Sequence, residues 1–143
     1  MQSVHHLEAD ADIALPVFTE RVSCGFPSPA ADYKDDAIDL VKSLIQHPSA
    51  TYVLRVSGDS MRDAAIVPES MLLVDASLQA GDGDIVVARL SSGFTVKRLR
   101  LHPSPHLMPE NPNYAPIPIT EWDEVHILGV VTAVITQPLR HQY

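Results

Sequence analysis

The chain has 143 residues, a formal net charge of −8, and 45% hydrophobic against 20% charged residues. This length fits one ordinary domain with a tail, and this balance is typical of a globular protein that buries a core. The acidic excess disfavours direct binding to nucleic acid, because such a surface repels phosphates. A single cysteine excludes an internal disulfide framework and suits a reducing compartment.

Targeting and metal signals are absent from the sequence pattern. The N-terminus lacks a basic segment followed by an apolar one, so we expect no signal peptide. No apolar run approaches the ~20 residues of a membrane helix, and we therefore expect a cytoplasmic protein without a membrane segment. The seven histidines form no metal-ligand spacing, so we expect neither a metal nor a cofactor.

Residues 1–31 form the first predicted region, an extended N-terminal arm. The arm is acidic at Glu8, Asp10 and Asp12, and from Pro27 onward it is rich in Pro, Ser and Ala. It shows little periodic pattern, so the sequence predicts neither a helix nor a strand in it.

A short helix is predicted next, within "DYKDDAIDLVKSLIQHP". Its apolar residues recur at helical spacing: Ile38, Val41, Leu44 and Ile45. Asp32 or Asp35 is the expected N-cap, and His47 followed by Pro48 ends the helix. We expect about three turns.

After Pro48 the pattern changes to strands. The predicted strands cover residues 51–57, 70–76, 83–90, 94–101, 115–119 and 124–136. The sequence Ser91-Ser92-Gly93 predicts a hairpin between the third and the fourth of them. Short strands with polar turns indicate a mostly β domain with one short helix, and we assign residues 32–143 to it.

The segment "SGDSM" at 57–61 contains the first candidate for chemistry. Ser60 follows Gly58 in a predicted turn at the end of a strand. A serine in such a turn can expose its hydroxyl beside backbone N–H groups that stabilise an oxyanion. Turns of this kind are common, so this pattern alone favours a structural role.

Lys97 is the second candidate, and strand periodicity places it. Period two puts four residues on one face: Thr95, Lys97, Leu99 and Leu101. Arg98 and Arg100 mark the other face as partly solvated, so Lys97 is predicted to point inward. Burial lowers the pKa of a lysine and makes its neutral amine available as a general base for a serine. The alternative is an edge-strand lysine that reaches water.

Several motifs together carry a resemblance. In the strand region these are "SGDSM" at 57–61, "GDIVVA" at 83–88, "FTVKRL" at 94–99 and "PENPNYAPIPI" at 109–119, and before it "CGFPSPAADY" at 24–33 and "LIQHPSATY" at 44–52. In this order they resemble the LexA/UmuD family of self-cleaving serine peptidases, and its UmuD-like members most. The likeness covers nearly everything from Cys24 to Gly129.

The resemblance implies a LexA/signal-peptidase-like β domain and a set of site residues. Ser60 is implied as the nucleophile and Lys97 as the general base. The scissile peptide bond is implied to join Cys24 to Gly25, so Cys24 supplies the attacked carbonyl and no catalytic thiol. The backbone N–H groups of Asp59 and Ser60 are implied as oxyanion donors.

The resemblance also implies a biological setting, the SOS response to DNA damage. It implies a homodimer whose self-cleavage is stimulated by a RecA–single-stranded-DNA filament. The processed dimer would be the accessory subunit of an error-prone, UmuC-like Y-family translesion DNA polymerase. The repressor function of LexA is not expected, because only 24 residues precede the implied cut.

Alternatives remain open. One is a non-catalytic dimeric adaptor of the same fold that regulates a DNA polymerase, and another is a leader peptidase, which the lack of a membrane segment disfavours. Cleavage within one chain or between two chains is also open, because the eight residues from Cys24 to Asp32 reach ~26 Å when extended.

Overall fold

The computed structural model describes residues 13–18, 21–25 and 34–138. The chain divides into two compact units, Met1–Gln46 and His47–Tyr143. The predicted arm at 1–31 belongs to the first unit, and all of the residues predicted to form the mostly β region after Pro48 belong to the second. The boundary predicted between residues 31 and 32 stays a prediction.

The N-terminal unit contains a pair of antiparallel strands. β1 (Ala14–Phe18) pairs with β2 (Lys34–Asp39), with Leu15 opposite Ile38. The register shifts between Leu15 and Val17, where Pro16 has no N–H to donate. The sequence prediction lacks β1, because its five residues include a proline and do not alternate between apolar and polar side chains.

The helix is shorter than predicted. α1 spans Leu40–Leu44, and its N-cap is Asp39, whose side chain accepts a hydrogen bond from Lys42 N at 3.2 Å. The predicted cap at Asp35 is wrong, because Asp35 lies within β2, where pairing with β1 engages the backbone. The other predicted cap, Asp32, lies outside the described residues.

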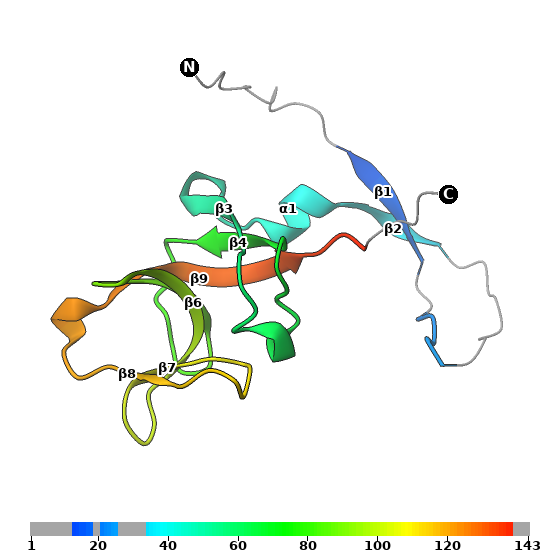
Figure 1. Ribbon diagram of the computed structural model, residues 1–143. Coiled ribbons are helices and arrows are strands. Elements are labelled where there is room, and N and C mark those ends of the chain that lie inside the picture. The colour runs from blue at the N-terminus through cyan, green and yellow to red at the C-terminus, as the bar shows by residue number, and fades with distance from the viewer. Residues whose placement is uncertain (1–12, 19–20, 26–33, 139–143) are drawn as a thin grey trace, which may run out of the picture. The chain divides into compact units, whose positions relative to one another are not determined.

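The C-terminal unit is a seven-stranded antiparallel sheet, in the order β3-β4-β9-β5-β6-β7-β8. Its strands are β3 (Thr51–Arg55), β4 (Met71–Asp75), β5 (Ile85–Leu90), β6 (Gly93–Arg100), β7 (His106–Met108), β8 (Ile117–Pro118) and β9 (His126–Ile135). In Figure 1 the long strand β9, in orange, runs beside β4, and it pairs with β5 on its other side.

The mostly β prediction is confirmed, and in the region after Pro48 it missed one strand, in addition to β1 and β2 before it. Each of the six predicted segments after Pro48 contains an observed strand. β7 escaped prediction because it has only three residues and follows Pro103 and Pro105. Short 3-10 turns fill three connections: Pro48–Ala50, Arg62–Ala64 and Trp122–Glu124.

The predicted hairpin joins β5 to β6. Leu90 pairs with Gly93, so Ser91 and Ser92 form a two-residue turn. Gly93 has a φ of +128°, which favours glycine. This register places Val86 of β5 opposite Lys97 of β6.

Two clusters of buried residues form the core of the C-terminal unit. The first consists of Val86, Ala88, Leu99, Leu107, Ile119 and Val130, and the second of Met61, Ile66, Leu72, Val74 and Val87. Because Val87 lies between Val86 and Ala88, β5 packs against one cluster on each face. The sheet around β5 and β6 is thus a rigid support for side chains that extend from it.

The described ranges contain neither a membrane-spanning helix nor a cluster of metal-binding side chains. None of the helices in residues 13–18, 21–25 and 34–138 is long and apolar enough to cross a membrane. The same ranges hold no group of three or more His, Cys, Asp or Glu side chains arranged to bind a metal.

Candidate active site

Ser60 lies in a tight turn that the core holds in place. The chain leaves β3, turns at Gly58 with a φ of +83°, and reaches the half-buried Ser60 two residues later. The next residue, Met61, is 3% exposed and belongs to the second buried cluster. Gly58 permits the turn and Met61 anchors it, so the serine backbone has a fixed position.

Lys97 is buried on β6, as the strand period predicts. Its exposed fraction is 7%, and that of Leu99 on the same face is 2%. Arg100, on the opposite face, is exposed. The prediction that Lys97 points inward is confirmed, and the alternative of a lysine that reaches water is excluded.

The lysine amine meets the serine hydroxyl. Lys97 Nζ lies 3.0 Å from Ser60 Oγ, 2.6 Å from Thr95 Oγ1 and 3.1 Å from the carbonyl oxygen of Val96. A charged ammonium donates one hydrogen bond to each of these oxygens. A neutral amine donates to Thr95 and Val96 and accepts from the serine hydroxyl. The three contacts therefore satisfy both protonation states.

Electrostatics favour the neutral amine. Burial lowers the pKa of Lys97 below its ordinary value, because the charged form loses water. None of the ion pairs found in the described part of the chain includes Lys97, so no carboxylate opposes this shift. Those pairs are His47–Asp75, Arg55–Glu69, Arg62–Asp63 and Arg98–Glu110.

The backbone at the serine leaves two donors available. In the part of the chain that the structure describes, the N–H groups of Asp59 and Ser60 donate to no protein acceptor. The carbonyl groups are engaged instead: Asp59 O accepts from Arg62 N at 3.2 Å, and Ser60 O accepts from Glu110 N at 2.9 Å. Held peptide groups with free N–H donors have the character of an oxyanion site.

A cleft of about 670 Å³ adjoins the serine. Its walls are mostly apolar and come from five strands, β3, β4, β5, β6 and β9, and from the segment that follows β3. The lining includes Tyr52, Leu54, Val56, Ser60, Phe94 and Val96. A cleft between strands suits an extended peptide, whose backbone pairs with strand edges and whose alternate side chains enter apolar pockets.

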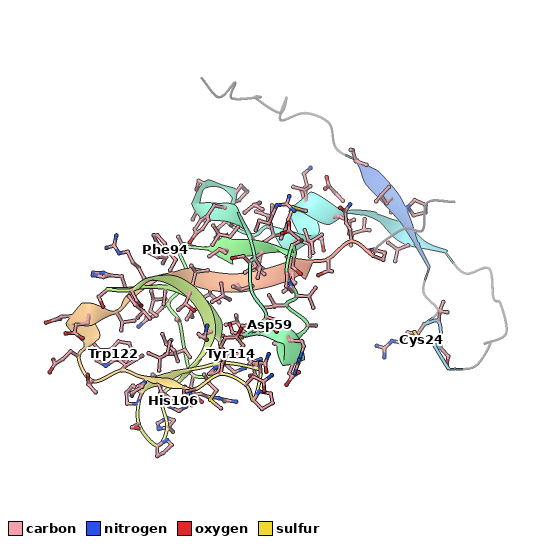
Figure 2. All side chains as sticks on the ribbon, in the orientation of Figure 1. Cys24, Asp59, Phe94, His106, Tyr114 and Trp122 are labelled. Carbon is pink, nitrogen blue, oxygen red and sulfur yellow. The ribbon has the colours of Figure 1, made fainter. Side chains whose placement is uncertain are left out.

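Cys24 and Gly25 lie in the other unit, in the connection between β1 and β2. Both residues are exposed, and Cys24 is a free thiol, labelled in Figure 2. Gly25 N donates to Ser23 Oγ at 3.3 Å, and a Cβ on Gly25 would meet no atom within 4 Å. An exposed connection of this kind is open to cleavage. Its attack by Ser60 stays a prediction.

Three polar residues at the site were not predicted as site residues from the sequence. Thr95 shares a face with Lys97, and this period-two relation was the available signal. Asn111 and Tyr114 both contact Asp59, across 52 and 55 residues of sequence. No local pattern predicts contacts over such separations, because they depend on which strands pair in the folded sheet.

The sequence matches a known protein family over most of its length. The model of the family described as Peptidase S24-like matches residues 16–132, well over half of the chain. The chain belongs to the Peptidase S24-like family. The resemblance to self-cleaving peptidases of the LexA/UmuD type is thereby confirmed at the family level, together with the mostly β fold.

Individual relatives of this S24-like chain cover most of its length. Protein MucA of Salmonella typhimurium is 47% identical over 128 residues, which is 88% of each chain. Protein SamA of the same organism is 45% identical over 120 residues, 84% of each chain. The LexA repressor of Bordetella avium is 39% identical over 92% of this chain but only 61% of the repressor. The match to LexA thus leaves more than a third of the repressor without a counterpart.

Proposed function

We propose that this S24-like chain is a self-cleaving serine endopeptidase that cuts its own peptide bond between Cys24 and Gly25. The observation that carries the proposal is the 3.0 Å contact between Ser60 Oγ and the Nζ of the buried Lys97. A serine beside a lysine of lowered pKa is a known nucleophile–base pair.

The first half of the reaction forms an acyl-enzyme. Neutral Lys97 takes the hydroxyl proton of Ser60 while Oγ attacks the carbonyl carbon of Cys24. The electron pair of the C=O bond moves to oxygen, and the N–H groups of Asp59 and Ser60 stabilise this oxyanion. When the carbonyl reforms, the C–N bond breaks, and the Lys97 ammonium gives its proton to the nitrogen of Gly25.

The second half releases the acyl group. Lys97, neutral again, takes a proton from water, and the hydroxide attacks the ester carbon of Cys24. The bond to Ser60 Oγ breaks, and Lys97 returns the proton to Oγ. The products are residues 1–24, with a free carboxylate, and residues 25–143, with a free amine.

The hydrogen bonds around Lys97 suit this sequence of proton transfers. The amine alternates between neutral and charged forms, and Thr95 Oγ1 and the Val96 carbonyl accept from it in both. Few groups therefore need to reorganise between the steps, which is favourable for a base that also acts as an acid.

We further propose the setting that the UmuD-like resemblance implies. In the cytoplasm, the homodimer would cleave itself when a RecA–single-stranded-DNA filament favours the conformation with the arm in the cleft. The cut form would then serve as accessory subunit of an error-prone Y-family polymerase. Family membership supports this proposal, and pull-down of a polymerase subunit by residues 25–143 tests it.

Intact mass of the incubated protein tests the peptidase itself. Wild type, Ser60→Ala and Lys97→Ala are incubated at about pH 7 and about pH 10, because burial lowers the pKa of Lys97 and a higher pH deprotonates more of it. Wild type is expected to yield residues 25–143, faster at the higher pH, because more Lys97 is neutral there. Both variants are expected to stay whole.

The same experiment distinguishes the peptidase from the non-catalytic adaptor. If wild type stays intact at both pH values, the incubation is repeated with a RecA filament. Continued absence of cleavage would contradict the peptidase and favour a non-catalytic dimeric adaptor. Cleavage of Ser60→Ala at the rate of wild type would instead point to a contaminating protease.

A further inference from the structure

The loop at 109–114 contacts the turn that carries the proposed nucleophile. Glu110 N donates to the carbonyl oxygen of Ser60 at 2.9 Å, and Asn111 Nδ2 donates to the carbonyl oxygen of Asp59 at 2.9 Å. Tyr114 Oη donates to Asp59 Oδ1 at 2.5 Å, and Figure 2 labels these two side chains next to each other. The reaction described above uses none of the three loop residues.

Asn111 orients a peptide group rather than a side chain. The carbonyl of Asp59 and the N–H of Ser60 belong to the same planar trans peptide, so they point in opposite directions. A donor that fixes the carbonyl oxygen of Asp59 therefore also fixes the direction of the Ser60 N–H. That N–H is one of the two free donors at the site.

Tyr114 restrains a carboxylate beside these donors. The side chain of an aspartate readily accepts hydrogen bonds from nearby backbone N–H groups of its own turn. An unrestrained Asp59 carboxylate would thus compete with an oxyanion for the same donors and repel its charge. The hydrogen bond from Tyr114 holds Asp59 Oδ1, and the same contact raises the pKa of Tyr114.

The loop is itself anchored firmly enough to position the turn. Asn111 is 3% exposed, and its Oδ1 accepts from Asn113 N at 3.0 Å. Glu110 Oε1 accepts from Arg98 Nε at 2.5 Å, and Arg98 directly follows Lys97 on β6. The loop therefore links the turn with the serine to the strand with the lysine.

We propose that Asn111 and Tyr114 are positioning residues for self-cleavage. Asn111 aims the Ser60 N–H at the developing oxyanion, and Tyr114 keeps the Asp59 carboxylate away from it. This inference rests on the proposed peptidase function, and it adds a source of rate enhancement that is separate from the serine and the lysine.

A double-mutant cycle in the full-length chain tests the role of Tyr114. The first-order rate of appearance of residues 25–143 is measured at about pH 10 for wild type, Tyr114→Phe, Asp59→Asn and the double variant. Tyr114→Phe is expected to slow cleavage about tenfold when Asp59 is present. In the Asp59→Asn background, which has no carboxylate to restrain, it is expected to change the rate less than about twofold. An equal loss in both backgrounds would overturn this role.

The pH profile tests the role of Asn111. Asn111→Leu removes the donor, and Asn111→Ala removes it without adding bulk or charge, in case the leucine variant does not fold. Each is expected to lower the rate roughly 10- to 100-fold at every pH. The reason is that the Ser60 N–H is still present but no longer points at the oxyanion. The pH of the half-maximal rate, which Lys97 sets, should not move. A shifted midpoint with an unchanged maximum would contradict the proposal.

Asn113→Ala is the matched control in the same loop. The exposed Asn113 side chain makes no hydrogen bond within the described residues, and its backbone N–H is unchanged by the substitution. Its rate should stay within about twofold of wild type. The outcomes separate the two proposals. If the wild-type chain never cleaves, both proposals are overturned. If the wild type cleaves but the Asn111 and Tyr114 variants cleave equally fast, only the positioning role is overturned.

Discussion

In the C-terminal unit, the surroundings of two buried titratable residues favour opposite charge states, the charged form of Asp75 and the neutral form of Lys97. Asp75 accepts from Ser77 N at 2.9 Å and Ser77 Oγ at 2.5 Å and lies 2.6 Å from His47 Nδ1, and these contacts lower its pKa. Lys97 has hydrogen-bond partners but no carboxylate, and burial lowers its pKa. Asp75 is thereby kept charged, as a structural ion is, whereas Lys97 is driven toward the neutral form that a general base needs.

The lowered pKa of Lys97 predicts a dependence of stability on pH. Between the folded and the unfolded pKa the unfolded chain binds more protons, so stability rises with pH. The penalty for the buried charge is full below the folded pKa and vanishes above the unfolded value near ~10.4. In a Ser60→Ala background that prevents cleavage, Lys97→Met should raise Tm by a few °C at about pH 7, the effect of roughly 1 kcal/mol. This gain should fade toward pH ~10.4.

Arg89→Met is the control for loss of a positive charge. Arg89 is exposed on the neighbouring strand β5, and an arginine stays protonated through this pH range. Its effect on Tm should therefore be the same at each pH. A gain from Lys97→Met that is equally flat with pH would contradict a depressed lysine pKa.

At the scale of elements, the packing of β9 beside β4 depends on a glycine, Gly129. A Cβ on Gly129 would lie 2.6 Å from Val74 Cγ1 and 3.0 Å from the carbonyl oxygen of Asp75. The branched Val74 side chain and the backbone have little room to yield, so Gly129→Ala should destabilise the unit by about 1–3 kcal/mol. Thermal unfolding should show Tm lower by roughly 4–12 °C.

Gly81→Ala is the matched substitution for that experiment. A Cβ on Gly81 would meet only Asp84 Oδ2, at 3.8 Å, an ordinary contact. Its Tm should lie within about 2 °C of the parent, because relief of backbone entropy offsets small losses. Equal shifts for the two variants would show that the close approach at Gly129 does not limit packing.

The elements also show which parts of the structure a sequence pattern can predict. Strands with β-branched runs between polar turns were predicted, as was the hairpin at Ser91-Ser92-Gly93, because these signals are local. Period two placed Lys97 on the buried face for the same reason. The helix start was wrong, because the pairing of β2 with a proline-containing β1 overrides the helical pattern around Asp35.

The contacts around the candidate site are less predictable. Ser60 and Lys97 are 37 residues apart, and their meeting at 3.0 Å depends on how strands far apart in the sequence pair in the sheet. The sequence suggested each of the two as a candidate, and only the family resemblance paired them. Asn111 and Tyr114 had no recognisable local role, because a hydrogen bond to a distant turn, whether to its backbone or to a side chain, leaves no periodic pattern in the sequence.

At the scale of the whole molecule, the predicted cut changes what holds the arm. β1 lies before Cys24 and β2 lies after Gly25, so the cut divides the strand pair between two fragments. In the intact chain the connection keeps β1 close to its partner at a high effective concentration. After the cut, β1 is held within the described residues by its pairing with β2, and an isolated two-stranded pair is marginally stable in water.

Residues 1–24 should therefore leave the protein after cleavage. Size-exclusion chromatography and mass spectrometry of the cleaved sample at micromolar concentration should find residues 25–143 without the peptide. The Tm of this fragment should stay within a few °C of the uncut Ser60→Ala chain, because both buried clusters belong to His47–Tyr143. Co-elution of the peptide with the fragment would contradict the prediction.

The two-residue turn at Ser91 and Ser92 has a consequence for the chemistry itself. Successive residues of β6 face opposite sides, so the pairing of β5 with β6 decides whether Lys97 or Arg98 lies inward. A turn longer by one residue would allow the pairing to slip by one position and exchange the two faces. The inward group would then be a guanidinium, which cannot give up its proton. The length of one hairpin turn thus selects between a base and a permanent cation beside Ser60.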